Sequence, residues 1–452
     1  MQYTEAVDRL QALGAELHTP PGQPRRKFEL AQMRTLMAAL RDPQQQFRSV
    51  LVAGTNGKGS TASTLASILA ASGLRTGLYT SPHLVRVNER IRILSPAATH
   101  QVADTLIPDE DFSGHLEQVI RAAERLVSLG QLPGPPSFFE TVTAMAFLHF
   151  AATSVDIGVL EVGLGGRLDA TNIVEPVLSI ITDISLDHTE WLGHTIAEIA
   201  REKAGILRPN GVLVTLPQHP EANQAIGEAS VALNVRAINA AAALPYGTTT
   251  VTHSRNRYAA DIDGLRIEVD SPLAGQHQQR NLALAISAAM ELGNSFSYEL
   301  SREAIEAGIR QTRWPARLER LSKGGRVVLL DVGHNPAGAW SLRAALSAEL
   351  RPPQHLIFGC LDDKPVEELA QILFPIFEHV LLVPVPSPRA ATGERLLAAA
   401  TSTGTTARVE PNLGAALASL PPTADAVITG SVYLVGEARG LLLAGGWVSH
   451  AG

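Results

Sequence analysis

The amino-acid sequence predicts a protein of the α/β class with two domains. Short apolar runs that read as strands alternate with stretches of helical periodicity, in one series that begins near residue 49 and another near residue 326. Alternation of this kind implies parallel strands with helices covering both faces of a sheet. A chain of 452 residues is also too long for one compact core, so two or three domains are expected.

The first series follows an expected helix at residues 4–17, where apolar residues recur at helical spacing. The next predicted elements are strands at 49–53, 75–80, 155–162 and 177–184 and a helix at 60–71. Residues 212–270 differ, because short β-like segments there are separated by turn residues (GVLVTLPQ, TTTVTHS and GLRIEVDSPL). They predict a small β-rich subregion packed on the first domain, before a helix at 278–292.

The second series predicts a C-terminal Rossmann-like α/β domain. Its strands are expected in RVVLLDVGHNP, HLIFGCL, HVLLVPV and DAVITGSVYLV, and AGAWSLRAAL is an expected helix. Pro315 interrupts the pattern in RQTRWPARLER, so the boundary is expected near residue 312, which gives domains at 1–311 and 312–452. Two such domains predict two sheets that face a shared cleft.

The bulk composition excludes several classes of protein. A net charge of -7 argues against a general nucleic-acid binder. The sequence shows neither a signal peptide nor an uncharged apolar run long enough to span a membrane, so the cytoplasm is the expected compartment. Cys360 is the single cysteine, which excludes an internal disulfide, and its apolar flanks favour a small core residue over a reactive thiol.

The stretch VLVAGTNGKGS has the features of a phosphate-binding loop but departs twice from the pattern G-x-x-x-x-G-K-[ST]. Val52 replaces the first glycine, and Gly59 replaces the hydroxyl residue after the lysine. The context still fits, since a strand precedes the loop, Gly54 and Gly57 allow an anion to approach backbone N–H groups, and Lys58 supplies a cation. The first domain is therefore predicted to be P-loop NTPase-like, with an ordinary glycine-rich turn as the less favoured alternative. A GTPase is disfavoured because no [NT]-K-x-D segment follows.

Polar residues at the ends of the predicted strands indicate a metal site. Ser81 follows the second strand, Glu161 ends the third, and His188 follows the fourth. In parallel sheets ligands bind beyond the carboxyl ends of the strands, so these side chains are expected to converge at the edge that carries the phosphate loop. Mg²⁺ must find a replacement for the missing loop hydroxyl, either from a hydroxyl just downstream or from this edge. Each residue alone fits a structural role equally well, and only the three together favour the metal.

A lysine on an apolar helix face is the next candidate. In TIAEIAREKAGIL, Lys203 shares one face with Ile196, Ile199, Ala200 and Leu207. The spacing is equally compatible with a stem that snorkels to the surface and with a half-buried lysine that is deprotonated and modified.

Two further regions carry candidate ligand contacts. Phe138 and Phe139 precede a predicted helix, where their rings could stack on a flat ligand, and burial in the core is the alternative for at least one of them. In the second domain Asp331 ends a strand and His334 lies on the loop that follows. Arg317, in the linker, is placed to contact a phosphate when the domains close, with an exposed arginine as the alternative.

Six motifs together resemble those of the folylpolyglutamate synthases and the bacterial bifunctional dihydrofolate/folylpolyglutamate synthases. They are GTNGKGS, TSPHL, EVGLGGRLDATN, SLDHTEWLG, REKAGI and DVGHNP, in this order, and the resemblance covers about residues 50–435. The wider relatives are muramyl peptide ligases, which carry a threonine directly after the loop lysine, so Gly59 and Ser60 point to the folate branch. The chain departs from many relatives at Gly333, where they have alanine, and it matches less closely at PSFFE.

The resemblance implies ATP-dependent formation of an amide between a folate carboxylate and L-glutamate, through an acyl phosphate. It also implies bound Mg²⁺, with Ser81, Glu161 and His188 as ligands, and a carbamylated Lys203 that supports a second ion. Lys58, Lys203 and His188 are the implied catalytic residues. The expected partners are small molecules only (ATP, L-glutamate, and a folate or dihydropteroate), with no nucleic acid and no membrane, and a monomer is expected.

The same resemblance assigns the remaining site residues. The implied ATP contacts are Thr55, Asn56, Gly57, Lys58, Gly59, Ser60, Asn281, Arg317 and Asp331. The implied substrate contacts are Ser137, Phe138, Phe139, Glu140, Leu168, Asp169 and Ala170 on the pterin side and His334 and Ser431 near the incoming glutamate. A muramyl peptide ligase and a non-catalytic nucleotide-binding regulator remain open as other functions, as does the choice between making dihydrofolate, lengthening the glutamate tail, or both.

Overall fold

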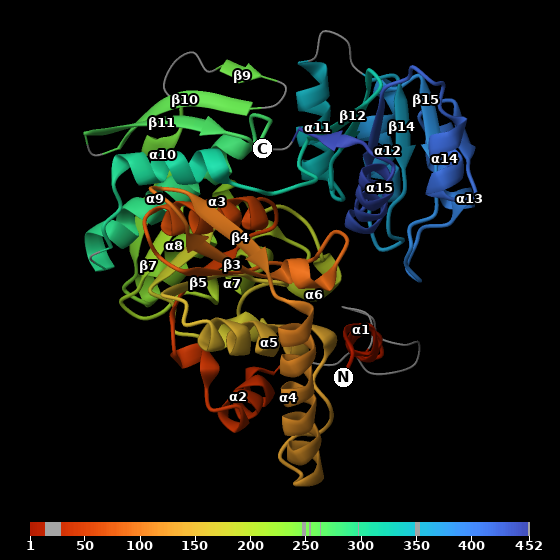
Figure 1. Ribbon diagram of the computed structural model, residues 1–452. Coiled ribbons are helices and arrows are strands. Elements are labelled where there is room, and N and C mark those ends of the chain that lie inside the picture. Colours follow the sequence, from red (N-terminus) through yellow and green to blue (C-terminus); the bar gives the residue numbers. More distant parts are fainter. Residues whose placement is uncertain are drawn as a thin grey trace.

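Two large sheets, joined by residues 312–318, dominate the computed structural model (Figure 1). The structure describes residues 1–13, 29–245, 250–252, 255–262, 264–296, 298–348 and 353–450. The N-terminal part holds an eight-stranded and a three-stranded sheet, and the C-terminal part a seven-stranded one. Both large sheets are mainly parallel, which confirms the α/β class.

The eight-stranded sheet has the strand order β4-β3-β2-β5-β1-β6-β7-β8. Its strands are β1 (Arg48–Ala53), β2 (Thr76–Tyr79), β3 (Ile91–Pro96), β4 (Val102–Leu106), β5 (Ile157–Glu161), β6 (Leu178–Ile181), β7 (Val212–Thr215) and β8 (Arg236–Asn239). The strands from β2 to β8 in this order pair in parallel, and β3 and β4 add an antiparallel edge. The loops after β1, β2, β5 and β6 therefore gather at one edge.

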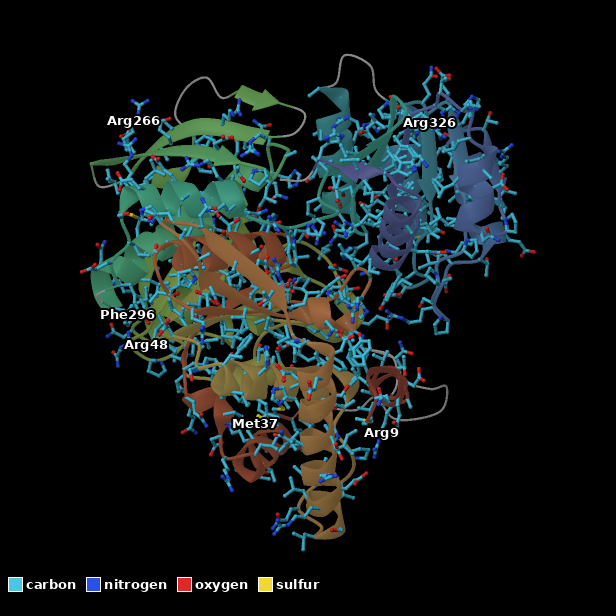
Figure 2. The ribbon with its side chains drawn as sticks, in the orientation of Figure 1. Arg9, Met37, Arg48, Arg266, Phe296 and Arg326 are labelled. Carbon is cyan, nitrogen blue, oxygen red and sulfur yellow. The ribbon has the colours of Figure 1, made fainter. Side chains whose placement is uncertain are left out.

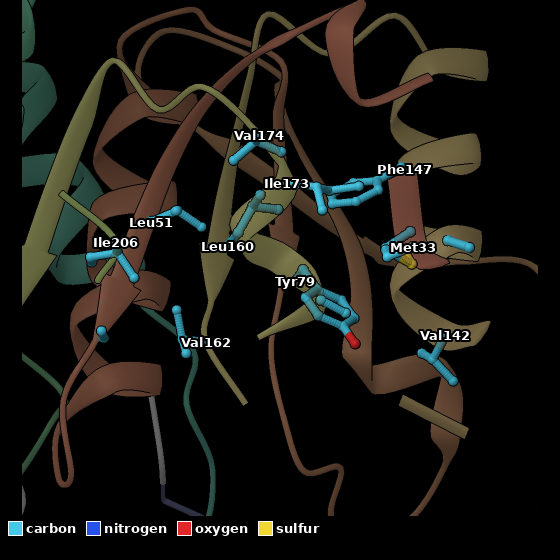
Figure 3. Close-up of a cluster of buried hydrophobic side chains, with 14 of the residues drawn as sticks. Met33, Leu51, Tyr79, Val142, Phe147, Leu160, Val162, Ile173, Val174 and Ile206 are labelled. Carbon is cyan, nitrogen blue, oxygen red and sulfur yellow. The ribbon is translucent and has the colours of Figure 1, made fainter. Parts of the chain in front are cut away.

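Helices cover both faces of this sheet because its strands are apolar on both sides. Along β1, Leu51 packs into one core cluster and Val52 into the other. Figure 3 shows the first cluster, where Leu51, Leu160 and Tyr79 lie with Phe147 of α5. Helices of the first face are α1 (Tyr3–Gln11), α2 (Leu30–Ala39), α4 (Asp109–Ser128), α5 (Phe138–Ala152), α7 (Ile196–Ala204) and α8 (Pro220–Ala232). Those of the second face are α3 (Lys58–Ala71), α9 (Gln278–Phe296) and α10 (Arg302–Gln311).

The β-rich subregion is smaller than its predicted span of 212–270. It is an antiparallel sheet of β9 (Thr250–Thr252), β10 (Arg255–Ile262) and β11 (Leu265–Ser271), in contact with α9 and α10 (Figure 1). GVLVTLPQ belongs instead to the parallel sheet as β7, and this part of the prediction was wrong. The reason is that Leu213 and Val214 are buried on opposite faces and α8 follows, which makes a βαβ unit with β8.

The C-terminal sheet has the order β16-β15-β14-β17-β13-β12-β18. Its strands are β12 (Glu319–Lys323), β13 (Arg326–Leu330), β14 (His355–Phe358), β15 (His379–Leu382), β16 (Ala407–Val409), β17 (Ala426–Thr429) and β18 (Val448–Ser449). Helices α11 (Pro336–Ser347), α12 (Val366–Leu373) and α13 (Gly393–Ser402) pack on one face. Helices α14 (Leu413–Ser419) and α15 (Val432–Ala444) pack on the other.

Three element boundaries differ from the sequence expectation. The first helix ends at Gln11, and residues 14–17 of its predicted span lie outside the described residues. DAVITGSVYLV is not one strand, since Gly430 turns the chain at φ 105° and Ser431 caps α15. Helix α7 ends at Ala204, so Leu207 is a buried residue after the helix.

Most buried side chains are apolar, and the buried charged ones include Glu161, Lys203 and Lys364. Figure 2 shows Arg9 and Arg266 at the surface of two separate parts of the molecule. Cys360 is fully buried, and burial raises the pKa of its thiol to about 12, so it behaves as the predicted core residue. Within the described part of the chain, every helix is too short or too polar to cross a bilayer.

Candidate active site

The phosphate loop joins β1 to α3 and needs glycine at two of its positions. Gly54 and Gly57 have φ of 150° and 89°, in the region that side chains rarely adopt. A Cβ atom at Gly54 would lie 1.7 Å from Oγ1 of Thr182, and one at Gly57 would lie 2.1 Å from Oδ1 of Asn281. The loop is therefore pressed between the end of β6 and the start of α9.

Hydrogen bonds to the residues that follow β6, the neighbour of β1 in the sheet, fix the shape of this loop. The backbone N–H groups of Thr55 and Asn56 donate to the carbonyl oxygen of Asp183 at 2.9 and 3.2 Å. The hydroxyl of Thr182 donates to the carbonyl oxygen of Asn56 at 2.8 Å. Nζ of Lys58 donates to the carbonyl oxygen of Thr55 at 3.0 Å, which holds the ammonium group over the loop.

The missing hydroxyl after Lys58 has a steric explanation. A Cβ atom at Gly59 would lie 2.3 Å from Cζ2 of Trp314, which belongs to the segment between the two large sheets. The indole occupies the space that a serine or threonine side chain needs in the common pattern. Trp314 also lies under the guanidinium group of Arg317, 5.5 Å from Cζ to the ring centroid.

The three predicted metal ligands line one cavity. Glu161 is 4% exposed, and its Oε2 accepts a hydrogen bond from the backbone N–H of Ser81 at 3.1 Å. Burial raises the pKa of Glu161 even though the positive charge of Lys58 opposes it, so a bound cation would favour the ionised carboxylate. His188 has φ 49°, and burial lowers its pKa to about 4, so its imidazole is neutral and free of proton competition at neutral pH.

These side chains alone do not make a complete metal site. Among the described residues, no three His, Cys, Asp or Glu side chains are grouped so as to hold a metal ion. A serine hydroxyl and a carboxylate are nevertheless the oxygen ligands that Mg²⁺ prefers, and Mg²⁺ usually takes its other ligands from water and substrate phosphates. The donor set fits an ion that binds together with a phosphate.

Lys203 is buried on α7, although its spacing in the sequence was equally compatible with a stem that snorkels to the surface. It is 4% exposed, and its Nζ donates to the carbonyl oxygen of Gly54 at 2.7 Å. Burial, followed by the charge of Lys58, lowers its pKa to about 7, although Asp187 and Asp169 oppose the shift. With a pKa of about 7, about half of the molecules carry Lys203 as a neutral amine at pH 7. The burial of Lys203 and its bond to Gly54 exclude the snorkelling alternative.

Asp187 is a central residue that the sequence left without a role. Its carboxylate accepts hydrogen bonds from Nζ of Lys364 at 2.8 Å and Nδ2 of Asn335 at 3.1 Å, both from the C-terminal domain. Nε2 of His334 lies 3.7 Å from the same group. Burial alone would raise the pKa of Asp187, but these neighbours together with His188 hold it well below its usual range.

The connecting segment presents Arg317 from a strained backbone. Ala316 and Leu318, on either side of it, both have positive φ, at 59° and 51°. The N–H of Ala316 donates to Glu319 at 2.8 Å, and the N–H of Leu318 donates to Asp331 at 3.0 Å. Two carboxylates thus stabilise the strained turn.

The predicted pterin-side residues have structural partners of their own. Ser137 and Glu140 form a capping box at the start of α5. Phe138 lies under Arg90, 5.0 Å from Cζ to the ring centroid, and Phe139 packs on Tyr79. Asp169 accepts hydrogen bonds from the N–H groups of Leu164 and Thr171 at 2.9 and 3.0 Å, which shapes the glycine-rich loop. Ser137, Phe138, Phe139, Glu140 and Asp169 thus each have a structural role beside any contact with a ligand.

One cavity of about 690 Å³ connects these groups. Its walls include residues 54–60, the three candidate metal ligands, Lys203, the pterin-side loops, and Asn281, Arg317, Asp331, His334 and Ser431. The structure thus brings every predicted site residue to one cavity, which has the size of ordinary ligand sites. The hydroxyl of Ser431 caps α15 by accepting the N–H of Tyr433 at 3.2 Å.

Comparison with known proteins gives the family. The Mur ligase middle domain matches residues 115–289, and the Mur ligase, glutamate ligase domain matches residues 316–434. The folylpolyglutamate synthase of Lacticaseibacillus casei is 36% identical over 447 residues, which cover 98% of this chain and 100% of the relative. The dihydrofolate synthase/folylpolyglutamate synthase of Bacillus subtilis is 32% identical over 428 residues, 91% of this chain and 94% of the relative. The chain belongs to the folylpolyglutamate synthase/dihydrofolate synthase family.

As a member of this family the chain is an ATP-dependent ligase. The solved FPGS–AMPPCP–folate complex superposes with a TM-score of 0.81 at 33% identity and covers 98% of this chain and 100% of its own. This confirms the fold expected from the sequence and favours the folate ligase over the muramyl peptide ligase.

Several cavity residues of this folate-ligase chain escaped the sequence analysis. Lys364, Met33 and Trp191 line the cavity, and Lys364 is bonded to Asp187. Trp191 stands in SLDHTEWLG three residues after His188, so this motif could have indicated it. Met33 carried no signal, since it lies in α2, away from any strand end or recognised motif. Lys364 lies in the segment that follows β14, so its place after a predicted strand could have indicated it.

Proposed function

We propose that this chain joins L-glutamate to the carboxylate of a folate at the expense of ATP, and that it also accepts dihydropteroate. The observation that carries the proposal is one continuous cavity, which connects the phosphate loop to the aromatic side chain of Phe138 and to His334 on the loop after β13. A reaction of ATP, an acid and an amine needs three such subsites side by side. The FPGS–AMPPCP–folate complex, which holds an ATP analogue and folate, supports the first two assignments.

ATP is proposed to bind at the phosphate loop, residues 55–60. Helix α3 begins at Lys58, so its N-terminal N–H groups and the ammonium group both face the phosphates. Arg317, supplied by the connecting segment, adds a second cation, and Asn281 and Asp331 are proposed as further contacts of the nucleotide. Phosphoryl transfer depends mainly on such positioning and charge neutralisation.

Ser81, Glu161 and His188 are the residues that would hold Mg²⁺. When bound, Mg²⁺ supplies charge neutralisation on the phosphate oxygens. Lys203 is proposed to react as a neutral amine with carbon dioxide, which forms an N–C bond and releases one proton to give a carbamate. The lowered pKa of Lys203, about 7, supports this because only the neutral amine has the lone pair that attacks.

The amide then forms in two steps. An oxygen of the acceptor carboxylate attacks the γ-phosphorus of ATP, and ADP leaves with the electron pair of the broken P–O bond. The amine of L-glutamate attacks the acyl phosphate, and the tetrahedral intermediate releases phosphate and a proton. His334 and Ser431, on the C-terminal wall of the cavity, are proposed to orient the incoming glutamate. We also propose a monomer whose domains divide near residue 312.

A product assay tests this function. The chain is supplied with ATP, Mg²⁺, L-glutamate and either dihydropteroate or tetrahydrofolate, and ADP and the new amide are measured in parallel. ADP release should require both glutamate and an acceptor, and Lys58→Ala should abolish it. ATP turnover that is unchanged without glutamate would contradict the proposal. Amide formation on a UDP-muramyl acceptor, with none on either pteridine, would show that the acceptor assignment is wrong.

A further inference from the structure

Helix α15 touches the loop after β2 at a point that has no room for a side chain. A Cβ atom at Gly436 would lie 1.9 Å from the carbonyl oxygen of Leu84 and 3.2 Å from its Cα. The obstacle is backbone, so no rotamer change can relieve it. Any residue other than glycine would push α15 and this loop apart.

The helix itself gives no reason for a glycine at this position. Gly436 lies in the interior of a helix of 13 residues and is absent from the glycines with positive φ. Glycine in a helix interior costs about 0.5–1 kcal/mol relative to alanine. The close approach of Leu84 is the feature that explains it.

The loop that meets Gly436 is held rigidly from its own domain. The carboxylate of Glu89 accepts hydrogen bonds from three successive N–H groups, those of Leu84 at 2.7 Å, Val85 at 3.2 Å and Arg86 at 3.0 Å. Three residues before Leu84, the N–H of Ser81 donates to Glu161. A displacement of this loop would therefore reach the candidate metal ligands.

The same loop reaches into the core of the C-terminal domain. The Leu84 side chain packs against the cluster that contains Leu434, Val435 and Ala438 of α15. One turn further along the helix, a Cβ atom at Gly440 would lie 3.9 Å from Cγ1 of Val85, which is an ordinary contact. The two glycines differ in that only Gly436 lies against the backbone of the loop.

We propose that Gly436 is a positioning residue that allows the loop at residues 81–86 to seat on α15 when the domains close. Seating would fix Ser81 beside Glu161 and bring Ser431, the cap of α15, to the same cavity. This inference rests on the proposed function, in which Ser81 holds Mg²⁺ and Ser431 orients glutamate.

Gly436→Ala and Gly440→Ala make a matched pair for the kinetic test. In Gly436→Ala the kcat should fall by about tenfold or more. The KM for ATP should stay within about threefold, because the phosphate loop lies in the N-terminal domain and does not touch α15 at Gly436. Its Tm should fall only slightly, because the higher helix propensity of alanine offsets part of the packing lost between Leu84 and α15. Gly440→Ala should keep kcat within about twofold. Wild-type kcat in Gly436→Ala, or equal losses in the two variants, would overturn the proposal.

The distance between two spin labels, one on each domain, measures domain closure independently of catalytic activity. Spin labels on Val231→Cys and Val448→Cys, which are 83% and 61% exposed, mark the two domains. Buried Cys360, whose thiol pKa is raised to about 12, should stay unlabelled. Added AMPPCP and folate should leave Gly436→Ala with longer distances than the labelled parent, and identical distributions would overturn the proposal. If the parent ligates no glutamate but the distances still differ, the proposed function fails while the closing contact stands.

Discussion

At the scale of single residues, Lys203 links burial to a pH dependence. Its pKa is lowered to about 7, so the neutral amine accumulates as the pH rises through 7 and is depleted below it. We expect turnover in bicarbonate buffer to rise about tenfold between about pH 6 and pH 8, the change in the neutral fraction. His188, with its pKa lowered to about 4, stays neutral over this range and adds nothing to the rise.

The lowered pKa of Lys203 also makes the folding stability depend on pH. Between about pH 7 and the unfolded value of 10.5 the unfolded chain binds more protons at this lysine than the folded chain does, so folding stability gains from rising pH in that window. Lys203→Ala should lower turnover and should remove the dependence of turnover and of folding stability on pH in these ranges. Added acetate should restore part of the lost turnover. Full turnover of Lys203→Ala without acetate would contradict the role of the carbamate.

Gly59 gives a second prediction at this scale. Gly59→Ser restores the hydroxyl residue after the lysine, yet the new Cβ would lie 2.3 Å from Cζ2 of Trp314. We expect kcat/KM for ATP to fall by about tenfold or more, because either the loop or the indole under Arg317 must move. The double variant Gly59→Ser/Trp314→Leu should recover part of the loss. A single variant as active as the parent would show that the indole yields without cost.

At the scale of elements, the start of α5 separates a structural from a substrate role. The Ser137 hydroxyl and the Glu140 carboxylate satisfy N–H groups of the first turn. Ser137→Ala should therefore lower the free energy of unfolding by about 1 kcal/mol, measured by urea titration. Ser137→Thr keeps the cap and is the control. A large rise in the KM for the folate with no loss of stability would instead favour a direct substrate contact.

The elements also show which features a sequence can predict. The phosphate loop was predictable because β1, the glycines and α3 are neighbours in the chain, and the loop is shaped by local backbone needs. The place of β7 was not, since its strand pattern is the same in a parallel and an antiparallel sheet. The indole of Trp314 beside Gly59 was not predictable either, because the contact joins residues 255 positions apart (59 to 314) with no shared periodicity.

At the scale of the whole molecule, the site depends on contacts between its two domains. Ser81, Glu161 and His188 could be placed together from the sequence, since each ends or follows a predicted parallel strand of the first series. The partners of Asp187 could not, because Lys364 follows a strand of the other sheet and the sequence does not state how two sheets dock. A sequence with two α/β series therefore predicts a shared cleft but not the residues that meet across it.

The ion pair between Asp187 and Lys364 joins the two domains, and its removal tests whether this contact holds the site together. Both side chains are nearly buried, so removal of one leaves the other charge without its partner. Lys364→Met should lower kcat/KM for glutamate by about 100-fold, whereas Arg395→Met, which breaks surface ion pairs within one domain, should change it by less than about threefold. The double variant Lys364→Met/Asp187→Asn should lose less than the sum of the two single changes in free energy, because no uncompensated charge remains. Strict additivity would show that the two side chains act independently and that the contact across the domains does not hold the closed site.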